Sequence, residues 1–292
     1  MSWLQLELET NQTHAEELST LLEQLGAISV SLTASSSEPV FDESDKDNTF
    51  WERTKLSVLL NSKCNIDNLL IQLHSHIGSN AIYSHNIKFL EDKDWVNEFK
   101  SKYQPIFFSN KICISPSWCE PSKNKIATIV LDPGLAFGTG AHPTTSLCIE
   151  WFCKNDINNK IVIDYGCGSG ILAMVAVKFG AKKVFAIDID EQALNTTREN
   201  IEQNKLQEKI LVCHPENAVI PKADILVANI LQNPLKKLLK EFSSLTKPGS
   251  HIILSGLLST QTKECLTAYR THFNMDEPVL RKSWASLHGV RL

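Results

Sequence analysis

The chain has 292 residues, of which 42% are hydrophobic and 21% charged, and its formal net charge is -4. Without an excess of Lys and Arg it is not a general polyanion binder, so we expect no direct nucleic-acid readout. No apolar run approaches the roughly 18 residues of a transmembrane helix, and the first residues lack the pattern of a signal peptide. We therefore expect no membrane partner, and the length suits two domains better than one.

Residues 1–90 have the pattern of a small α+β domain, because apolar residues alternate or recur with helical spacing in six segments. The six are a strand at 3–8, a helix at 15–25, strands at 27–32 and 55–60, a helix at 67–77 and a strand at 82–90. The polar, acidic stretch at 35–48 is expected to be a loop. The order βαββαβ is that of the ferredoxin-like fold, and we expect this domain to recognise the substrate.

Residues 91–104 are expected to form a linker helix. Trp95, Phe99 and Tyr103 share one helical face, and Pro105 ends the helix. Such a helix is either a hinge between two domains or a packing helix at the start of the second, and the sequence favours neither.

Residues 105–292 alternate strands and helices, which is typical of an α/β unit with a parallel sheet covered on both faces. Helices are expected at 144–152 and 171–179. Strands are expected at 126–131, 162–165, 183–187, 210–213, 225–228, 252–255, 273–280 and 284–290.

The segment VIDYGCGSG, from Val162 to Gly170, is the most informative part of the chain. A buried strand leads into glycines at 166, 168 and 170, and an apolar helix follows at once. Glycine here permits a sharp turn, close approach of a ligand and close packing of helix on strand. The next strand ends in Asp188, whose carboxylate can accept hydrogen bonds from both ribose hydroxyls. We favour that interpretation over a helix cap, so the segment predicts a nucleoside site.

Asp164 distinguishes between nucleoside cofactors. A dinucleotide usually needs G-x-G-x-x-G spacing, which this turn lacks, and a buried carboxylate before Gly166 would repel a pyrophosphate. The same charge suits a cationic amino group. S-adenosylmethionine, with an amino acid end, a sulfonium and a ribose, therefore fits better than NAD.

Three further residues have competing interpretations. Asn229 follows the strand at 225–228 and should reach the same crevice as Gly166, although Asn is also common in turns and caps. His142 is either a general base or a structural residue in a tight loop. For Cys167 we favour a small residue beneath the turn over a nucleophile.

The cysteines and histidines are dispersed. The eight cysteines form no C-x-x-C pair, and the nine histidines have no zinc-site spacing. We therefore expect reduced thiols, a cytoplasmic protein and no metal.

The glycine-rich segment DPGLAFGTGAHPTT, residues 132–145, resembles the signature loop of the PrmA family, bacterial methyltransferases of one large-subunit ribosomal protein. The turn at 164–170, Asp188 and the Asn229-Ile230-Leu231 segment match that family in order and spacing, over nearly the whole chain. The resemblance implies a class I methyltransferase fold, Rossmann-like with a mostly parallel seven-stranded sheet, at residues 105–292. It also implies methylation of lysine side chains and of the N-terminal α-amine by S-adenosylmethionine.

Matched residue by residue, the resemblance implies that the cofactor site contains Thr145, Gly166, Gly168, Asp188 and Asn229. It further implies a wall near the methionine end, formed by Phe137, Gly138, Thr139 and Gly140. Ala141, Gln232 and Asn233 depart from the family pattern and concern the shape of the acceptor pocket.

Methyl transfer from a sulfonium requires alignment and exclusion of water more than acid–base chemistry. We expect a dry pocket to lower the pKa of the amine and Asn229 to orient its lone pair, without a dedicated base. The rival hypotheses are an NAD oxidoreductase, a methyltransferase of RNA or a small molecule, and a non-catalytic cofactor-binding protein. No heptad or apolar edge indicates assembly, so a monomer is expected.

Overall fold

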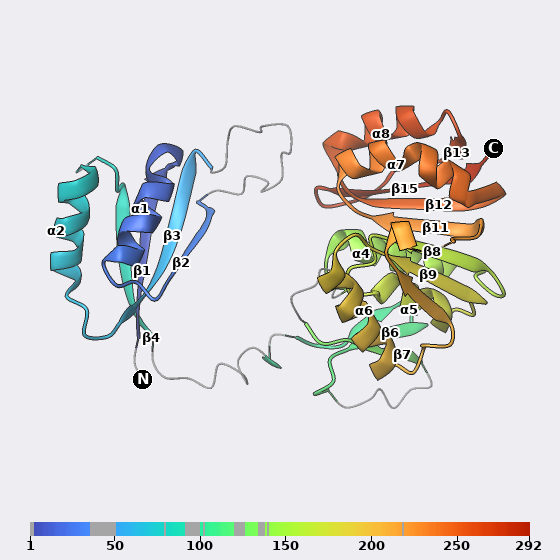
Figure 1. The fold of residues 1–292 in the computed structure, drawn as a ribbon, viewed down its shortest axis with the longest axis horizontal. Helices are drawn as coiled ribbons and strands as arrows, with labels where there is room; N and C mark the ends of the chain where they lie inside the picture. The colour runs from blue at the N-terminus through green and yellow to red at the C-terminus, as the bar shows by residue number, and fades with distance from the viewer. Residues whose placement is uncertain are drawn as a thin grey trace. The chain divides into compact units, whose positions relative to one another are not determined.

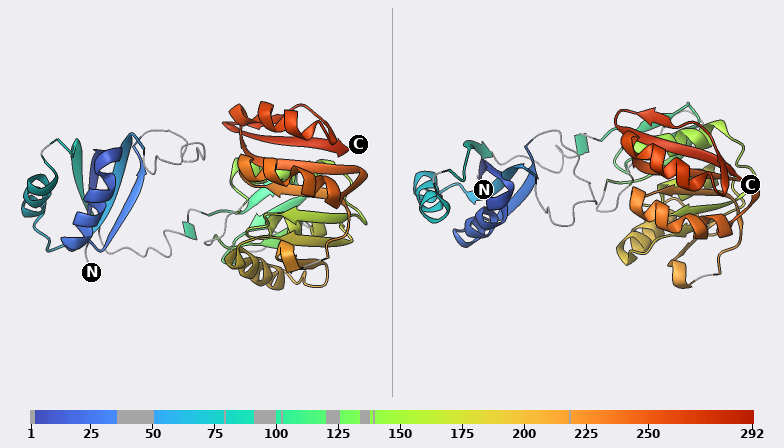
Figure 2. Two further views of the ribbon diagram at one scale, coloured as in Figure 1. Left: turned by 45° about the horizontal axis from the view of Figure 1, so that its top comes forward. Right: turned by 90° about the horizontal axis from the view of Figure 1, so that it is seen from above.

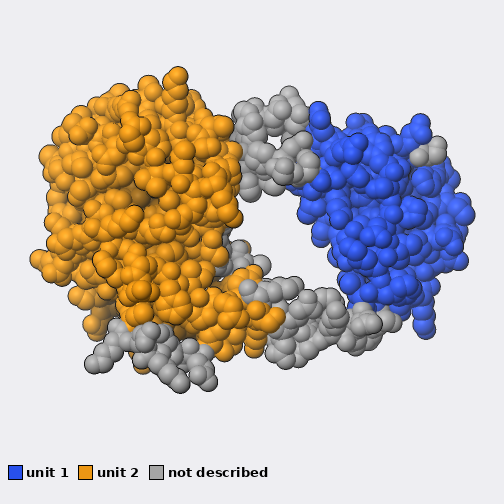
Figure 3. All heavy atoms as spheres, turned by 180° about the vertical axis from the view of Figure 1, so that it is seen from behind, with its two compact units in different colours: residues 1–98 blue, residues 99–292 orange. Residues whose placement is uncertain are grey.

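The computed structural model describes residues 3–35, 51–78, 80–90, 100–101, 103–119, 126–133, 138, 140–217 and 219–292. The chain separates into two compact units, residues 1–98 and 99–292 (Figure 3). Nearly all of the expected loop at 35–48, and residues 91–99 and 102 of the expected linker helix, lie outside the described residues. No helix in the described part of the chain combines the length and apolar character needed to cross a membrane.

The first unit has the predicted ferredoxin-like topology (Figure 1). Its elements are β1 (Trp3–Asn11), α1 (Gln12–Gln24), β2 (Ser29–Ala34), β3 (Arg53–Asn61), α2 (Ile66–Ile77) and β4 (Ser84–Leu90). The strands lie in the order β2-β3-β1-β4, and every neighbouring pair is antiparallel. Alternate residues of β1, among them Leu6, face a core that includes Leu18 of α1 and Leu73 of α2. The two-residue period of β1 therefore places both helices on one face of the sheet.

The second unit is built on a larger mixed sheet (Figures 1 and 2). Its strands are β8 (Ile161–Tyr165), β9 (Lys183–Ile187), β10 (Ile210–Cys213), β11 (Ala223–Asn229), β12 (Thr246–Leu258), β13 (Phe273–Met275), β14 (Val279–Arg281) and β15 (Trp284–Arg291). They lie in the order β10-β9-β8-β11-β12-β15-β13, with β14 paired to β15. The first five are parallel, and β15 runs antiparallel to β12 and β13.

The prediction of a single strand at 273–280 is wrong, because the structure has two short strands there, β13 and β14. Both pair with β15, at opposite ends of that strand. Pro278 lies between them and has no amide hydrogen for a ladder. The sheet consequently has eight strands, seven of them in the main order.

A separate three-stranded sheet contains β5 (Ile106–Phe108), β6 (Ile112–Ser115) and β7 (Ala127–Val130). Of these, the sequence predicted only β7. The β5–β6 hairpin turns at Ser109 and Asn110, whose φ angles are 48° and 52°. Two positive φ angles define a type I′ turn, for which Asn-Gly, not Ser-Asn, is the usual signal.

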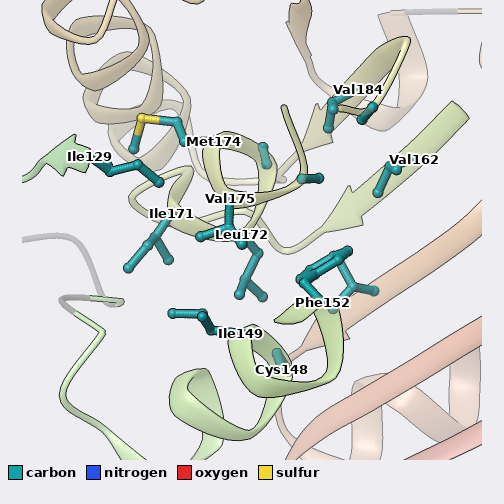
Figure 4. Close-up of a cluster of buried hydrophobic side chains, with 14 of the residues drawn as sticks. Ile129, Cys148, Ile149, Phe152, Val162, Ile171, Leu172, Met174, Val175 and Val184 are labelled. Carbon is teal, nitrogen blue, oxygen red and sulfur yellow. The ribbon is translucent and has the colours of Figure 1, made fainter. Parts of the chain in front are cut away.

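Helices cover both faces of the large sheet. They are α4 (Pro143–Lys154), α5 (Ile171–Lys178), α6 (Glu191–Gln203), α7 (Gln232–Leu245) and α8 (Thr262–Tyr269). On one face, Phe152 of α4 and Leu172 of α5 pack near Val162 of β8 (Figure 4). On the other face, Phe242 of α7 and Tyr269 of α8 belong to a second buried cluster. The residues of β8 alternate between these two clusters, as a sheet buried on both faces requires.

Candidate active site

The candidate site lies at the carboxyl edge of the parallel strands. β11 pairs with β8 on one side and β12 on the other, and its last residue, Asn229, is opposite Ser255. The turn after β8 and the segment after β11 therefore leave neighbouring strands at the same edge, where open α/β sheets bind ligands.

The glycine turn is closed by backbone hydrogen bonds to the next strand. The amides of Gly166 and Cys167 donate to the carbonyl of Ile187, over 2.8 and 3.0 Å. Gly166 has a φ of +77°, and a Cβ at this position would lie 2.2 Å from Cγ2 of Ile230. Glycine is therefore required both for the backbone conformation and for the close approach of the Asn229 segment.

Asp188 is held against this turn. Its Oδ2 accepts a hydrogen bond from the Gly168 amide at 3.0 Å, and its Oδ1 accepts one from the Asp190 amide at 3.1 Å. The cap of α6 is instead Asp190, whose side chain accepts from the Gln192 amide at 2.9 Å. An ionised carboxylate has about four lone-pair sites, so Asp188 keeps acceptor capacity for hydroxyl groups.

Asp164 is a buried carboxyl group with one satisfied oxygen. Its Oδ2 accepts from the Ala173 amide at 2.9 Å, whereas its Oδ1 has no hydrogen-bond partner. Burial raises the pKa of Asp164 to about 7, and the charge of Asp188 adds to the effect. A buried polar atom without a partner is rare and indicates a missing donor, such as a cationic ligand or a water.

Asn229 is the second polar group with an unpaired buried atom. Its Nδ2 donates to Oγ1 of Thr145 at 3.2 Å, and its Oδ1 has no partner. Thr145 is fully buried in the first turn of α4. The structure thus brings together two predicted site residues that are 84 positions apart.

His142 lies at the N-terminus of α4. Its Nδ1 is 2.7 Å from Oγ1 of Thr144, and the ring meets Trp284 edge-on, with 4.7 Å between ring centroids. Burial lowers the pKa of His142, which keeps the imidazole neutral near pH 7. The same Nδ1 accepts a hydrogen bond from the Thr144 amide at 3.4 Å, which caps the helix.

Cys167 is buried beneath the turn. Its sulfur lies 3.4 Å from Oγ1 of Thr197. Burial raises the pKa of Cys167, with the charge of Asp164 as a second cause, so the thiol is protonated at neutral pH. A protonated buried thiol is a poor nucleophile, in line with the interpretation favoured above.

The glycine-rich segment before α4 reaches the same turn. Ser169 donates through Oγ to the Gly138 carbonyl at 2.7 Å, and Ser146 donates to the Gly140 carbonyl at 2.9 Å. Phe137 and Thr139, also predicted for the site, lie outside the described residues.

Two residues of α6 support the turn and were not predicted from the sequence. Oγ1 of Thr197 donates to the Gly168 carbonyl, and Nδ2 of Asn200 donates to the Ser169 carbonyl, both over 2.9 Å. Thr197 occupies the buried stripe of α6 with Leu194 and Ile201. A polar residue inside an apolar helical stripe was the signal that could have revealed it.

In the part of the chain that the structure describes, no group of three or more His, Cys, Asp and Glu side chains could hold a metal ion.

The strand order and the glycine turn define a class I methyltransferase fold. Over residues 2–292 the chain matches the ribosomal protein L11 methyltransferase (PrmA) family, and it belongs to that family. The family resemblance and the fold class predicted from the sequence are both confirmed.

Individual relatives agree with this assignment. The ribosomal protein L11 methyltransferase of Shewanella woodyi is 41% identical over 292 residues, and that of Shewanella putrefaciens is 41% identical over 294 residues. Each alignment covers 100% of both chains. A crystal structure of ribosomal protein L11 methylase from Lactobacillus delbrueckii subsp. bulgaricus has a TM-score of 0.57 and 32% identity, covering 65% of this chain and 99% of that one.

Proposed function

We propose that this protein transfers methyl groups from S-adenosylmethionine to amino groups of ribosomal protein L11, namely lysine side chains and the N-terminal α-amine. Membership of the family supports the reaction and the substrate. The observation that carries the site assignment is the buried, unpaired Oδ1 of Asn229 at the carboxyl edge of the sheet. An amide oxygen there accepts a hydrogen bond from an amine while remaining neutral.

The donor would be held by the residues around the glycine turn. Asp188 would accept from the ribose hydroxyls, the backbone of Gly166 and Gly168 would lie against the nucleoside, and Thr145 would contact it beside Asn229. The unpaired Oδ1 of Asp164 supplies negative charge for a cationic ligand. Gly138, with Phe137, Thr139 and Gly140, would form the wall near the methionine end. When bound, S-adenosylmethionine supplies an electrophilic methyl carbon on a sulfonium.

The chain's own residues position the acceptor. Asn229 accepts a hydrogen bond from the incoming amine and turns the nitrogen lone pair toward the donor side. A dry pocket lowers the amine pKa, which is about 10.4 for free lysine, so the neutral nitrogen is more readily formed. His142 is engaged at the terminus of α4, and no dedicated base is needed.

The first test is direct methylation. Purified protein, L11 and isotopically labelled S-adenosylmethionine should give labelled L11, with lysine and α-amine sites located by mass spectrometry. Unlabelled L11, with label in RNA or a small molecule, would contradict the proposal.

The site is tested with Asn229→Ala. Loss of one transition-state hydrogen bond should lower kcat at least about tenfold, while the Kd for S-adenosylmethionine rises much less. Asn195→Ala is the matched control, because Asn195 is an exposed residue of α6 that bonds only to Arg198 in the described structure. Equal kcat values in the two variants would refute the role of Asn229.

The remaining assignments concern the whole chain. We assign residues 1–90 to recognition of L11, residues 91–104 to a linker that permits repositioning over several target amines, and residues 105–292 to methyl transfer. The protein would act as a monomer in the cytoplasm, where its substrate is made.

A further inference from the structure

Ile230, the residue after Asn229, is enclosed by two glycines. A Cβ on Gly166 would lie 2.2 Å from the Cγ2 atom of Ile230. A Cβ on Gly256 would lie 2.3 Å from its carbonyl oxygen, 2.7 Å from its carbonyl carbon and 2.9 Å from its amide nitrogen. The contact with Gly166 involves the side chain of Ile230. The contact with Gly256 involves only backbone, which cannot move without moving Asn229.

The geometry of β12 creates this contact. Its pairing register with β15 shifts between Leu254 and Leu257, and Gly256 has a φ of +86°. Ser255 lies within this irregularity and is hydrogen-bonded to the chain on both sides of β12. Its carbonyl accepts from the Ile230 amide at 3.1 Å, and its hydroxyl donates to the Ala285 carbonyl of β15 at 3.0 Å. The irregular strand thus presses the bare backbone of Gly256 against Ile230.

The placement of the backbone matters because the Asn229 side chain has one other described constraint, its hydrogen bond to Thr145. Its Nδ2 bonds to Thr145, while its Oδ1 has no partner among the described residues. The position of that oxygen therefore depends on the bond to Thr145 and on where the Asn229–Ile230 backbone lies.

We infer that Gly256 is a positioning residue for methyl transfer: acting through the Ile230 backbone, it sets the distance between the Asn229 amide and the glycine turn. The inference rests on the proposed function of Asn229. A methyl group at residue 256 would displace the Asn229–Ile230 backbone on the acceptor side of the site, since the three atoms nearest to it are all backbone atoms of Ile230. A displacement of about 1 Å is enough to cost on the order of a hundredfold in rate.

The test compares Gly256→Ala with Gly249→Ala. Both glycines belong to β12 and have positive φ angles, +86° and +78°, but a Cβ on Gly249 would meet nothing within 4 Å. Gly256→Ala should lower kcat for L11 methylation at least about tenfold while the Kd for S-adenosylmethionine changes less than about threefold. Gly249→Ala carries the same backbone strain and should keep its kcat. Equal kcat values, or a loss confined to cofactor binding, would overturn the inference.

A double-variant cycle separates positioning from general damage. If Gly256 acts through Asn229, then kcat of the double variant Gly256→Ala/Asn229→Ala should equal that of Asn229→Ala within about twofold. If the double variant instead loses kcat by the product of the two single-variant losses, the two residues act independently and the inference is rejected. Should Gly256→Ala fail to fold, Ser255→Ala removes the hydroxyl bond that ties the irregular part of β12 to Ala285, and it should also lower kcat. An unchanged kcat in Ser255→Ala would count against the inference.

The position of Asn229 can also be tested by structure determination, which requires no measurement of activity. Crystal structures of the wild-type protein and Gly256→Ala should show Ile230 and Asn229 displaced relative to Gly166 in the variant. Unchanged positions overturn the inference. If the wild-type protein binds S-adenosylmethionine but does not methylate L11, the proposed function fails, whereas the displacement still decides whether Gly256 sets the position of Asn229.

Discussion

Asp164 shows how burial changes the chemistry of a single residue. Its pKa of about 7 exceeds the ordinary value of 3.8, first because of desolvation. The folded protein therefore binds a proton that the unfolded chain releases. Stability must then fall as pH rises from about 4 through 7, since the folded state binds more protons over that range. A cationic ligand beside the unpaired oxygen would offset this cost.

Asp164→Asn should remove that pH dependence. An amide retains an acceptor for the Ala173 amide without carrying charge. The free energy of unfolding of the variant, relative to wild type, should increase between pH 5 and pH 8 by on the order of 3 kcal/mol in the absence of ligand. Urea titrations at both pH values measure it, and a constant difference would contradict the assignment. The variant should also bind S-adenosylmethionine more weakly.

His142 provides a second prediction for a single residue. As a helix cap, it should be replaceable by Asn, a good capping residue, with little loss of stability, whereas His142→Ala should cost about 1 kcal/mol. Both variants should keep kcat within about threefold, less than the loss of a general base would cause. Chemical unfolding and the pH profile of kcat test this. An activity abolished in both variants, with cofactor binding intact, would identify His142 as a base.

At the level of elements, Asn204 completes the hydrogen bonding of a strand. Asn204 caps the C-terminus of α6, and its side chain forms two hydrogen bonds with the backbone of Val130 in β7. Oδ1 accepts from the backbone N–H of Val130 at 2.8 Å, and Nδ2 donates to the Val130 carbonyl at 2.7 Å. β7 has a strand partner on one side, β6. One side chain thus satisfies backbone groups that an edge strand would leave open.

Asn204→Ala should accordingly destabilise the second unit by about 2 kcal/mol, because two partly buried backbone groups lose their partners. Asn204→Asp keeps the acceptor and loses the donor, so its effect should be intermediate. Asn155→Ala is the control, since Asn155 is exposed and bonds to one helix carbonyl. Thermal unfolding of the three variants gives the order of their stabilities. If Asn204→Ala is as stable as wild type, solvent replaces the side-chain amide at Val130.

The elements also show what a sequence can predict. The path from β8 through the glycine turn, α5 and β9 to Asp188 was predictable because its signals are local: an apolar run, glycines and an acid at a strand end. The β5–β6 hairpin was not, because Ser109 is unusual at a positive φ and no glycine marks the turn. Likewise the contact between Thr145 and Asn229 depends on the packing of α4 against β11, and that between Gly256 and Ile230 depends on the pairing of β11 with β12. A single sequence displays neither.

At the scale of the whole molecule, the two units have separate hydrophobic cores. The core of the first unit includes Leu6, Leu18 and Leu73, and the second has one core on each face of its sheet. Units with their own cores are expected to fold on their own.

Removal of residues 1–98 should therefore leave a folded protein that binds S-adenosylmethionine with a Kd within about threefold of wild type, while methylation of L11 is lost. Calorimetry measures the first quantity and mass spectrometry the second. Retained methylation would show that the first unit is not needed for recognition. Loss of cofactor binding would show instead that the second unit depends on the first.

The position of β15 has a consequence for biosynthesis. Among the strands of the large sheet it is made last, yet it lies inside the sheet, between β12 and β13. Until residue 291 has left the ribosome, β12 presents an open edge and β13 has no strand to join. The second unit can therefore complete this sheet only after translation of that last strand.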